Sequence, residues 1–386
     1  MPRTIQQERR PNTCAVIRRL TFAFLLLSVN PALTHAAETI ISGDVGPSVS
    51  EAGGHALAGS LAQASVEPSS GVLRTRLAIL VPHARGGPQP GLALDSSSTA
   101  GTREAGVGWG LALPVIERST QFGPPQYQDP TPDPNAAYTL DRFTFNGVPL
   151  VPLCMVGAKQ ACVTADSAVL PGWAGKGWMY FRLETDTAST RIFWSPDRFT
   201  WRVQVRGGEV LEFGNPLLGP FPGKPEDGLD FDVFLKGNTI QHKAFRWNLA
   251  RRWEPAANGG QPVNRIVYVW QQLDDTGRGY LIDIYDTPPA DSVPDRAPLD
   301  GYAHHTHLRW QRTPRVRNSI PPIWRMTFDQ QVAGIDVTSK SWAKPAGARE
   351  LVRRHHLTYI RQGEYSLLEG FQIEGPSEDF LRACGG

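Results

Sequence analysis

The chain has 386 residues, of which 40% are hydrophobic and 20% charged, and this composition excludes wholesale disorder. Its 38 Gly and 33 Pro are typical of a turn-rich β protein, and four Cys are too few for a miniprotein built on disulfides. No apolar run is long enough for a transmembrane helix, so the sequence predicts no membrane span.

The N-terminus resembles a secretion signal, which we place at residues 1–36. Arg18-Arg19 ends a basic start, Leu20 to Val29 forms a short apolar run, and small residues precede a cleavage site after Ala36. A short buried helix is the alternative. Removing this segment takes five Arg and one Glu from 39 basic and 37 acidic residues, which leaves 34 and 36, a net charge of −2. We therefore expect a secreted or extracellular protein with no basic face for nucleic acid.

Three cysteines remain after the predicted cleavage. Cys154 and Cys162 lie close in the sequence, and in an exported chain this spacing predicts a disulfide that closes a small loop. Two reduced thiols are the alternative. Cys384 is left without a partner in this scheme.

After the signal, residues 37–70 are rich in Gly, Ser, Ala and Pro, and we predict a flexible linker there. Leu73 to Val81 alternates apolar and polar residues, as a strand does. Gly207-Gly208 predicts a hairpin turn between two apolar runs. Further short aromatic and β-branched runs, most of them bounded by turn residues, occupy 178–183, 191–194, 199–205, 210–213, 265–270, 280–285, 323–328 and 357–360.

This rhythm predicts an all-β fold of multi-stranded antiparallel sheets, either a sandwich or a partial-barrel shell with long Gly/Pro loops. The rhythm continues along residues 71–386, which we therefore predict to be one β-rich domain. The polar, Pro-rich loops 214–228 and 286–300 are candidate subdomain boundaries.

Catalytic signatures are missing from the sequence. It contains no Gly-x-Ser-x-Gly elbow, His-Glu-x-x-His, Cys-x-x-Cys, phosphate-binding loop, EF-hand loop or Glu-x-Glu pair. We therefore predict no catalytic residues and no cofactor-binding residues, and expect that the protein is not an enzyme.

Two histidine groups are candidate metal ligands. His304, His305 and His307 form one, in which His305 and His307 would share a strand face, and His355-His356 is the other. No Asp, Glu or Cys follows at a ligand spacing, so solvated histidines are favoured and no metal is predicted. Asp274-Asp275 precedes two glycines, and there a plain turn is favoured over a calcium loop.

Tryptophan and arginine are neighbours at several places, including Trp201-Arg202, Arg246-Trp247 and Arg309-Trp310. Adjacent strand residues face opposite sides, so the pattern predicts Trp inward and Arg outward. The alternative is an exposed aromatic groove for carbohydrate or single strands.

The segment from Gly106 to Leu153 carries two family-like blocks, GVGWGLALPVIERST and DRFTFNGVPLVPL. Together with later blocks around Trp201 to Phe213, Trp247 to Tyr268 and Tyr280 to Tyr285, it resembles the N-terminal region of the SpvB family. The same region opens the B component of insecticidal toxin complexes.

The matched residues suit structural tasks. Gly108 and Gly110 flank Trp109, whose ring we expect to be buried, and Asn146-Gly147 offers the positive φ values of a tight hairpin. The resemblance implies a non-catalytic structural or docking segment of a secreted toxin-like or surface assembly, with a protein partner. A secreted carbohydrate-binding surface module is the first alternative, and a secreted hydrolase is the second.

Overall fold

A computed structural model describes the chain at residues 17–18, 62–84, 87–123, 125–127, 141–152, 171, 178–185, 189–217, 224–236, 239–254, 264–289, 298–313, 328–340 and 348–375. Except for Ile17–Arg18, the predicted signal peptide lies outside these residues, and so do Cys154, Cys162 and Cys384. Within them the chain forms antiparallel strands with short 3₁₀ turns and no α-helix, which confirms the all-β prediction. None of the described residues forms a helix that could span a membrane.

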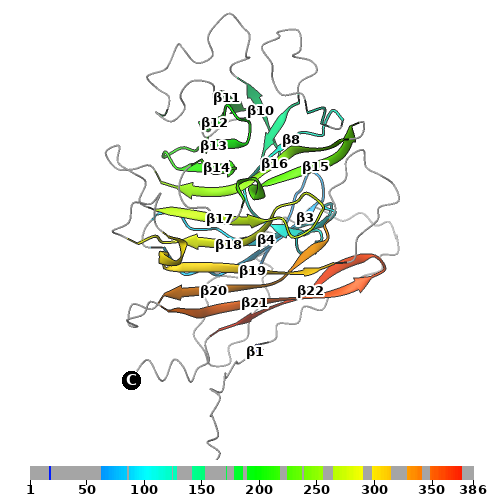
Figure 1. Cartoon of the computed structure of the whole chain (residues 1–386). Coiled ribbons are helices and arrows are strands. Elements are labelled where there is room, and N and C mark those ends of the chain that lie inside the picture. The colour runs from blue at the N-terminus through cyan, green and yellow to red at the C-terminus, as the bar shows by residue number, and fades with distance from the viewer. Residues whose placement is uncertain are drawn as a thin grey trace, which may run out of the picture.

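Eight strands close into a barrel, at the top of Figure 1. They are β8 (Val115–Arg118), β9 (Phe143–Phe145), β10 (Val148–Pro152), β11 (Met179–Leu183), β12 (Arg191–Trp194), β13 (Thr200–Gln204), β14 (Val210–Gly214) and β16 (Thr239–Trp253). Each strand pairs with the next, and β16 pairs with β8 through Trp247 and Ile116, so that the ring has no free edge. The turn η3 (Pro225–Gly228) leads into β15 (Leu229–Lys236), which pairs with β16.

The long strand β16 joins the barrel to a second, open sheet. Residues 246–248 pair with β8, whereas Arg251, Arg252 and Trp253 pair with both β14 and the first strand of the open sheet. One strand of 15 residues therefore serves two sheets along its length.

The open sheet continues below the barrel in Figure 1. Its strands are β17 (Arg265–Gln271), β18 (Tyr280–Asp286), β19 (His304–Arg312), β20 (Gln330–Lys340), β21 (Arg349–Gln362), β22 (Tyr365–Glu374) and the two-residue β1 (Ile17–Arg18). The turn η5 (Leu299–Gly301) precedes β19.

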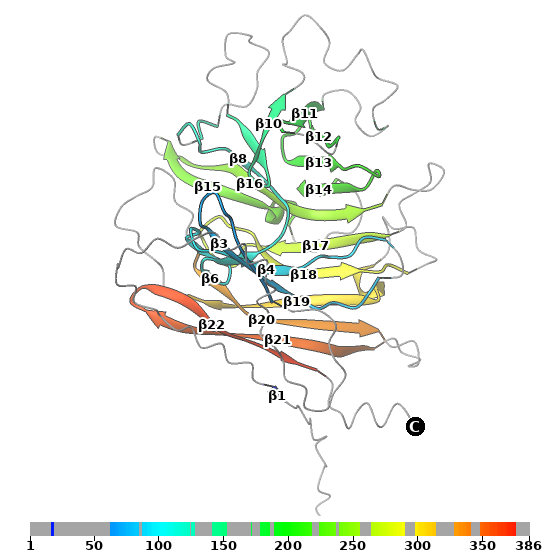
Figure 2. The ribbon, with the colours of Figure 1, turned by 180° about the vertical axis from the view of Figure 1, so that it is seen from behind.

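An N-terminal sheet covers one face of the open sheet, as the view from behind shows (Figure 2). It contains β2 (Ala62–Val66), β3 (Leu73–Ala78), β4 (Ala93–Ser97) and β7 (Trp109–Leu111), with β5 (Thr102–Arg103) and β6 (Gly106–Val107) as a small ribbon. Leu94 and Leu111 of this layer share a core with Leu308 and Ile335 of the open sheet. The covered surface is called the inner face below, and the opposite surface the outer face.

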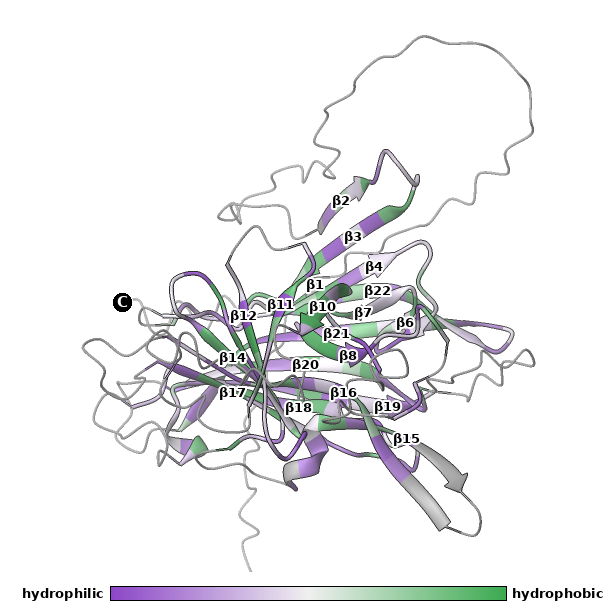
Figure 3. Ribbon diagram, turned by 90° about the horizontal axis from the view of Figure 1, so that it is seen from above, coloured by the Kyte–Doolittle hydropathy of each residue, from purple (hydrophilic) through white to green (hydrophobic). Residues whose placement is uncertain are grey.

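Large aromatic rings occupy the barrel core. Trp194 and Trp201 stack with their ring centroids 4.8 Å apart, and Phe143 and Trp247 meet them edge-on. All four side chains are almost completely buried, so the barrel interior is packed with side chains. Green strand segments alternate with purple ones when the strands are coloured by hydropathy (Figure 3).

The prediction that arginine beside tryptophan would point into solvent was wrong for Arg202. Its side chain does face away from Trp201, but Arg202 is only 5% exposed. Trp178 and Trp253 cover its guanidinium, and it donates to Glu212 at 2.7 Å. The outer wall of the barrel is thus covered here, and a buried arginine needs such a carboxylate partner.

The two loops predicted as subdomain boundaries lie between β14 and β15 (214–228) and between β18 and β19 (286–300). The strand that the barrel and the open sheet share is β16, whose residues lie outside both loops in the sequence. The boundaries therefore remain a prediction.

Candidate functional site

The family-like glycines lie where β7 meets β4. Trp109 pairs with Ser96, and its ring packs against the core but is half-buried, not fully buried as expected. Gly108 has φ +80°, and a Cβ there would come within 3.2 Å of the Ser97 carbonyl oxygen. This position therefore suits glycine for both conformation and space.

Asn146 and Gly147 form the turn between β9 and β10, with φ values of 51° and 80°. Both residues are in the left-handed region that a two-residue hairpin of type I′ requires. Asn146 Oδ1 also accepts a hydrogen bond of 2.9 Å from the Val115 N–H, which ties the turn to the start of β8. The arrangement shapes the backbone and contains no reactive group.

A row of polar residues crosses the outer face of the open sheet. The register places Asp283 opposite His307, His307 opposite Asp336, Asp336 opposite Arg354, and Arg354 opposite Glu374. Five neighbouring strands, β18 to β22, thus each contribute one charged or titratable side chain to a single line, which we call the polar row (strands in Figure 1).

His305 and His307 meet Asp283 at one end of the polar row. One oxygen of Asp283, Oδ1, lies 2.7 Å from His305 Nε2 and 2.7 Å from His307 Nδ1. The Tyr285 ring stacks on His305 with centroids 4.4 Å apart and an interplanar angle of 6°. The sequence prediction that His305 and His307 share a strand face is consistent with this geometry. Their partner Asp283 was missed because it lies 22 positions before His305.

The electrostatics of this cluster follow from its contacts. Burial opposes ionisation of Asp283, but the hydrogen bonds from His305 and His307 outweigh burial and hold its pKa at about 2. The hydrogen bond to Asp283 raises the pKa of His307 above its usual value, although partial burial acts in the opposite direction. Asp283 is therefore an anion at neutral pH with two imidazole rings directed at it.

The other histidines separate onto both faces. His304 lies on the inner side with its Nδ1 2.7 Å from Asp286 Oδ1, and His355 is buried against Phe371. His356 lies on the outer face, where Nε2 is 2.9 Å from Glu374 Oε2. The two histidine groups of the sequence are therefore each divided between the faces by strand alternation.

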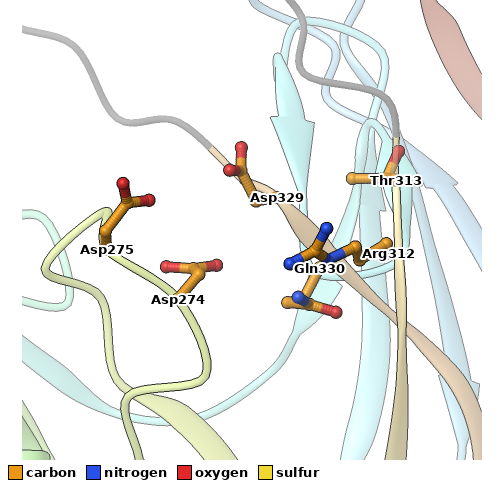
Figure 4. A pocket seen from close by; sticks show the side chains of 6 residues that line it. All are labelled: Asp274, Asp275, Arg312, Thr313, Asp329 and Gln330. Carbon is orange, nitrogen blue, oxygen red and sulfur yellow. The ribbon is translucent and has the colours of Figure 1, made fainter.

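A pocket of about 500 Å³ opens beside the open sheet (Figure 4). It is lined by Asp274, Asp275, Arg312, Thr313, Asp329 and Gln330. Asp274 Oδ1 accepts the Thr276 N–H at 3.0 Å, and Oδ2 accepts the Tyr280 hydroxyl at 2.7 Å. Both oxygens of this carboxylate thus hold the local turn, as expected for a plain turn residue.

A buried charge cluster, separate from the polar row, lies between the barrel and the open sheet. Asp230 Oδ1 accepts from Asn248 at 2.8 Å and from the Gly279 N–H at 2.9 Å. Its Oδ2 lies 3.4 Å from Arg278 Nη2, and the Arg278 guanidinium covers the Phe328 ring. These groups fasten the β17–β18 turn to β15 and β16, which is a structural task.

Comparison with known proteins supports the resemblance to the SpvB family. Residues 67–215 match the family described as Salmonella virulence plasmid 65kDa B protein, SpvB. The predicted resemblance is confirmed. The matched residues therefore include the strands from β3 to β14, whereas β2 and the barrel strand β16 lie outside the match. A search of curated protein sequences found no match.

Solved structures share the fold. The N-terminal domain of effector protein SpvB from Salmonella typhimurium strain LT2 aligns with a TM-score of 0.50 and 17% identity, over 78% of this chain and 100% of that domain. TcdB2-TccC3 aligns with a TM-score of 0.54 and 18% identity, over 83% of this chain. The Photorhabdus luminescens Tc holotoxin pore aligns with a TM-score of 0.52, 16% identity and 80% coverage of this chain. The chain spans only 16% of TcdB2-TccC3 and 15% of the holotoxin chain.

Proposed function

We propose that this chain is a non-catalytic structural or docking segment of a secreted toxin-like assembly, with a protein as its partner. The observation that carries the proposal is the extent of the structural match. The chain covers the whole of the SpvB N-terminal domain but only 16% of TcdB2-TccC3, so its fold corresponds to one segment of a larger toxin chain.

The use of the family-like residues supports the same proposal. Gly108, Asn146 and Gly147 adopt positive φ values that shape turns, and Trp109 packs against the core. The barrel interior is filled by aromatic rings. These residues specify a rigid surface and place no nucleophile or acid–base pair in a cavity.

The carbohydrate-binding alternative gains no support from the aromatic residues. None of the tryptophans in the described part of the chain is fully exposed, and Trp194, Trp201 and Trp247 are completely buried. A sugar-binding groove would instead require aromatic faces open to solvent.

The hydrolase alternative rests on the pocket of Figure 4, because three carboxylates converge there. Both oxygens of Asp274 accept hydrogen bonds within its turn, and Asp275 and Asp329 are the other two carboxylates that line the pocket. Their variants Asp275→Asn and Asp329→Asn therefore provide the sharpest test of a catalytic role.

The test uses the full chain, carrying a C-terminal affinity tag, produced in its native host and purified from the secreted fraction. Cross-linking and mass spectrometry should identify a stoichiometric protein partner. The N-terminus of the exported protein should begin near Ala37. Parallel assays with ester, glycan and nucleotide substrates should show no turnover. Turnover that Asp275→Asn or Asp329→Asn abolishes would overturn the proposal, and so would a chain that stays in the cytoplasm without a partner.

A further inference from the structure

We propose that Asp283, His305 and His307 form a binding site for a divalent transition metal ion of the Zn²⁺ class on the outer face of the open sheet. Their three ligand atoms lie within 4.8 Å of one another, the arrangement of two imidazoles and a carboxylate around a single centre. This inference is independent of the proposed scaffold role, because it concerns a surface outside the matched SpvB region.

The strands supply the geometry. His305 and His307 are two positions apart on β19 and so point the same way, and Asp283 is the direct neighbour of His307 on β18. A His-x-His pair on one strand with a carboxylate on the adjacent strand needs no loop to bring the ligands together. The site is therefore largely built by the sheet itself, which reduces the ordering cost of binding.

The ligand types select the metal class. Imidazole nitrogen and carboxylate oxygen bind Zn²⁺ at about 2.0–2.2 Å, and imidazole disfavours Mg²⁺ and Ca²⁺, which prefer oxygen ligands. Ligand atoms of a tetrahedral zinc ion are about 3.3 Å apart, a separation that follows from those bond lengths. Asp283 Oδ1 is 2.7 Å from each ring nitrogen, so a small rotation of the carboxylate opens the space for the ion.

The surroundings favour a fixed but accessible site. Tyr285 stacks flat on His305 and restricts its ring, and Asp336, which is paired with Arg354, lies directly opposite His307. His307 is 42% exposed, so solvent reaches the ligands from the outer face. Three protein ligands with one open side leave at least one coordination position for water or for a side chain of a bound partner.

The outer face contains a matched control beside the polar row. His356 and Glu374 lie on the same outer face at a hydrogen-bond distance of 2.9 Å, and the His356 side chain is 37% exposed. This pair has one imidazole and one carboxylate but lacks the second histidine. A non-specific surface affinity for metal would involve His356 as much as His307.

The first experiment measures Zn²⁺ affinity by competition with a chromogenic chelator. It uses the full chain without a polyhistidine tag, with its cysteines alkylated so that thiolates cannot contribute. We expect one ion per chain. Removing partners that merely orient metal ligands typically weakens binding 10–100-fold, so His305→Ala, His307→Ala and Asp283→Asn should each weaken it at least about tenfold. His356→Ala should leave the affinity unchanged.

The second experiment needs no variant and covers the case in which a substitution disturbs folding. The wild-type chain is modified with diethyl pyrocarbonate, with and without one equivalent of Zn²⁺, and the histidines are mapped by mass spectrometry. Zn²⁺ should protect His305 and His307 and leave His356 reactive. Equal protection of all three histidines would overturn the proposal, and so would an affinity that survives the loss of both His305 and His307.

Discussion

The barrel and the open sheet are both made of antiparallel strands, but the barrel encloses an apolar interior whereas the open sheet leaves one polar face accessible to solvent. The barrel closes on itself and fills its interior with Trp194, Trp201, Trp247 and Phe143. The open sheet has an inner face that the N-terminal sheet covers and an outer face that carries the polar row. The matched SpvB region ends just after β14, so it contains the barrel strands β8 to β14 but none of the open-sheet strands β17 to β22.

This difference suggests a division of labour. A closed barrel has no strand edge with which another chain could pair, and its core tolerates little change. The exposed side chains of the polar row on the outer face can change without disturbing a core, because solvent reaches them. This division places the stability of the molecule in the barrel and the covered face and leaves the polar row energetically nearly neutral, which substitutions in each region can test.

The largest effect should come from the barrel core. Trp201 is completely buried and stacks on Trp194, so Trp201→Ala leaves a cavity that its neighbours cannot fill. We expect a loss of about 4 kcal/mol in the free energy of unfolding, as for other truncated core aromatics. Urea denaturation of both proteins measures it. The exposed Tyr365 provides the control, and equal losses for Trp201→Ala and Tyr365→Ala would contradict a packed barrel.

The second largest effect should be a pH dependence of the free energy of unfolding, caused by a histidine on the inner face of the open sheet. Burial lowers the pKa of His355 to about 4, and the nearby Arg353 acts in the same direction. The unfolded chain binds a proton near pH 6.5, whereas the folded chain does not bind it until near pH 4. Stability therefore falls as the pH drops through this window, by about 3 kcal/mol in total, and it is unaffected above pH 6.5.

The check is a series of urea melts between pH 4 and pH 7.5 on the wild-type chain and on His355→Phe. The variant keeps an aromatic ring beside Phe371 but cannot titrate. Its stability should fall less toward acid than that of the wild type. His307, whose raised pKa has the opposite sign, is present in both chains and cancels in the difference. If the stability of the two chains depended on pH in the same way, His355 would already be protonated or solvated in the folded state.

The accuracy with which the sequence predicts the strand positions depends on the kind of strand. Arg191 to Trp194 and Val210 to Phe213 were predicted within a residue of β12 and β14, because apolar runs bounded by turns are local signals. The long strand β16 was missed, since its lysine, arginine and histidine residues interrupt the apolar pattern. Closure of the barrel through Trp247 and Ile116 joins residues far apart in sequence, and no local pattern encodes it.

The residues of the candidate metal site were also only partly predictable, because the pairing of strands is not encoded locally. Strand alternation alone indicated that His305 and His307 share a face. Asp283 belongs to another strand, and only the register between β18 and β19 places it beside them. A sequence signal existed, because Asp283 lies in the predicted strand Tyr280 to Tyr285, but the pairing of that strand with the histidine strand was not predicted.

A smaller effect should come from the junction between the N-terminal sheet and the core. Trp109 is half-buried, so Trp109→Ala should cost about 2 kcal/mol, less than the full loss of a buried aromatic ring. Urea melts would measure this cost, with Trp109→Phe as the conservative control that should recover most of it. A loss below about 0.5 kcal/mol, typical of an ordinary surface position, would free the ring for a role in binding a partner.

The smallest effect should come from the ion pair of the polar row. Arg354 donates to both oxygens of Asp336 at 2.8 and 3.0 Å, but the arginine side chain is partly exposed, and exposed pairs contribute about 0.5 kcal/mol. A double-mutant cycle with Asp336→Asn and Arg354→Gln should measure a coupling of that size, and added salt should reduce it. The same cycle on the buried barrel pair Arg202 and Glu212 should give a larger, salt-insensitive coupling, because removing one partner there leaves an uncompensated buried charge. Equal couplings in the two cycles would mean that solvent reaches both surfaces alike, and the contrast between the barrel wall and the outer face would fail.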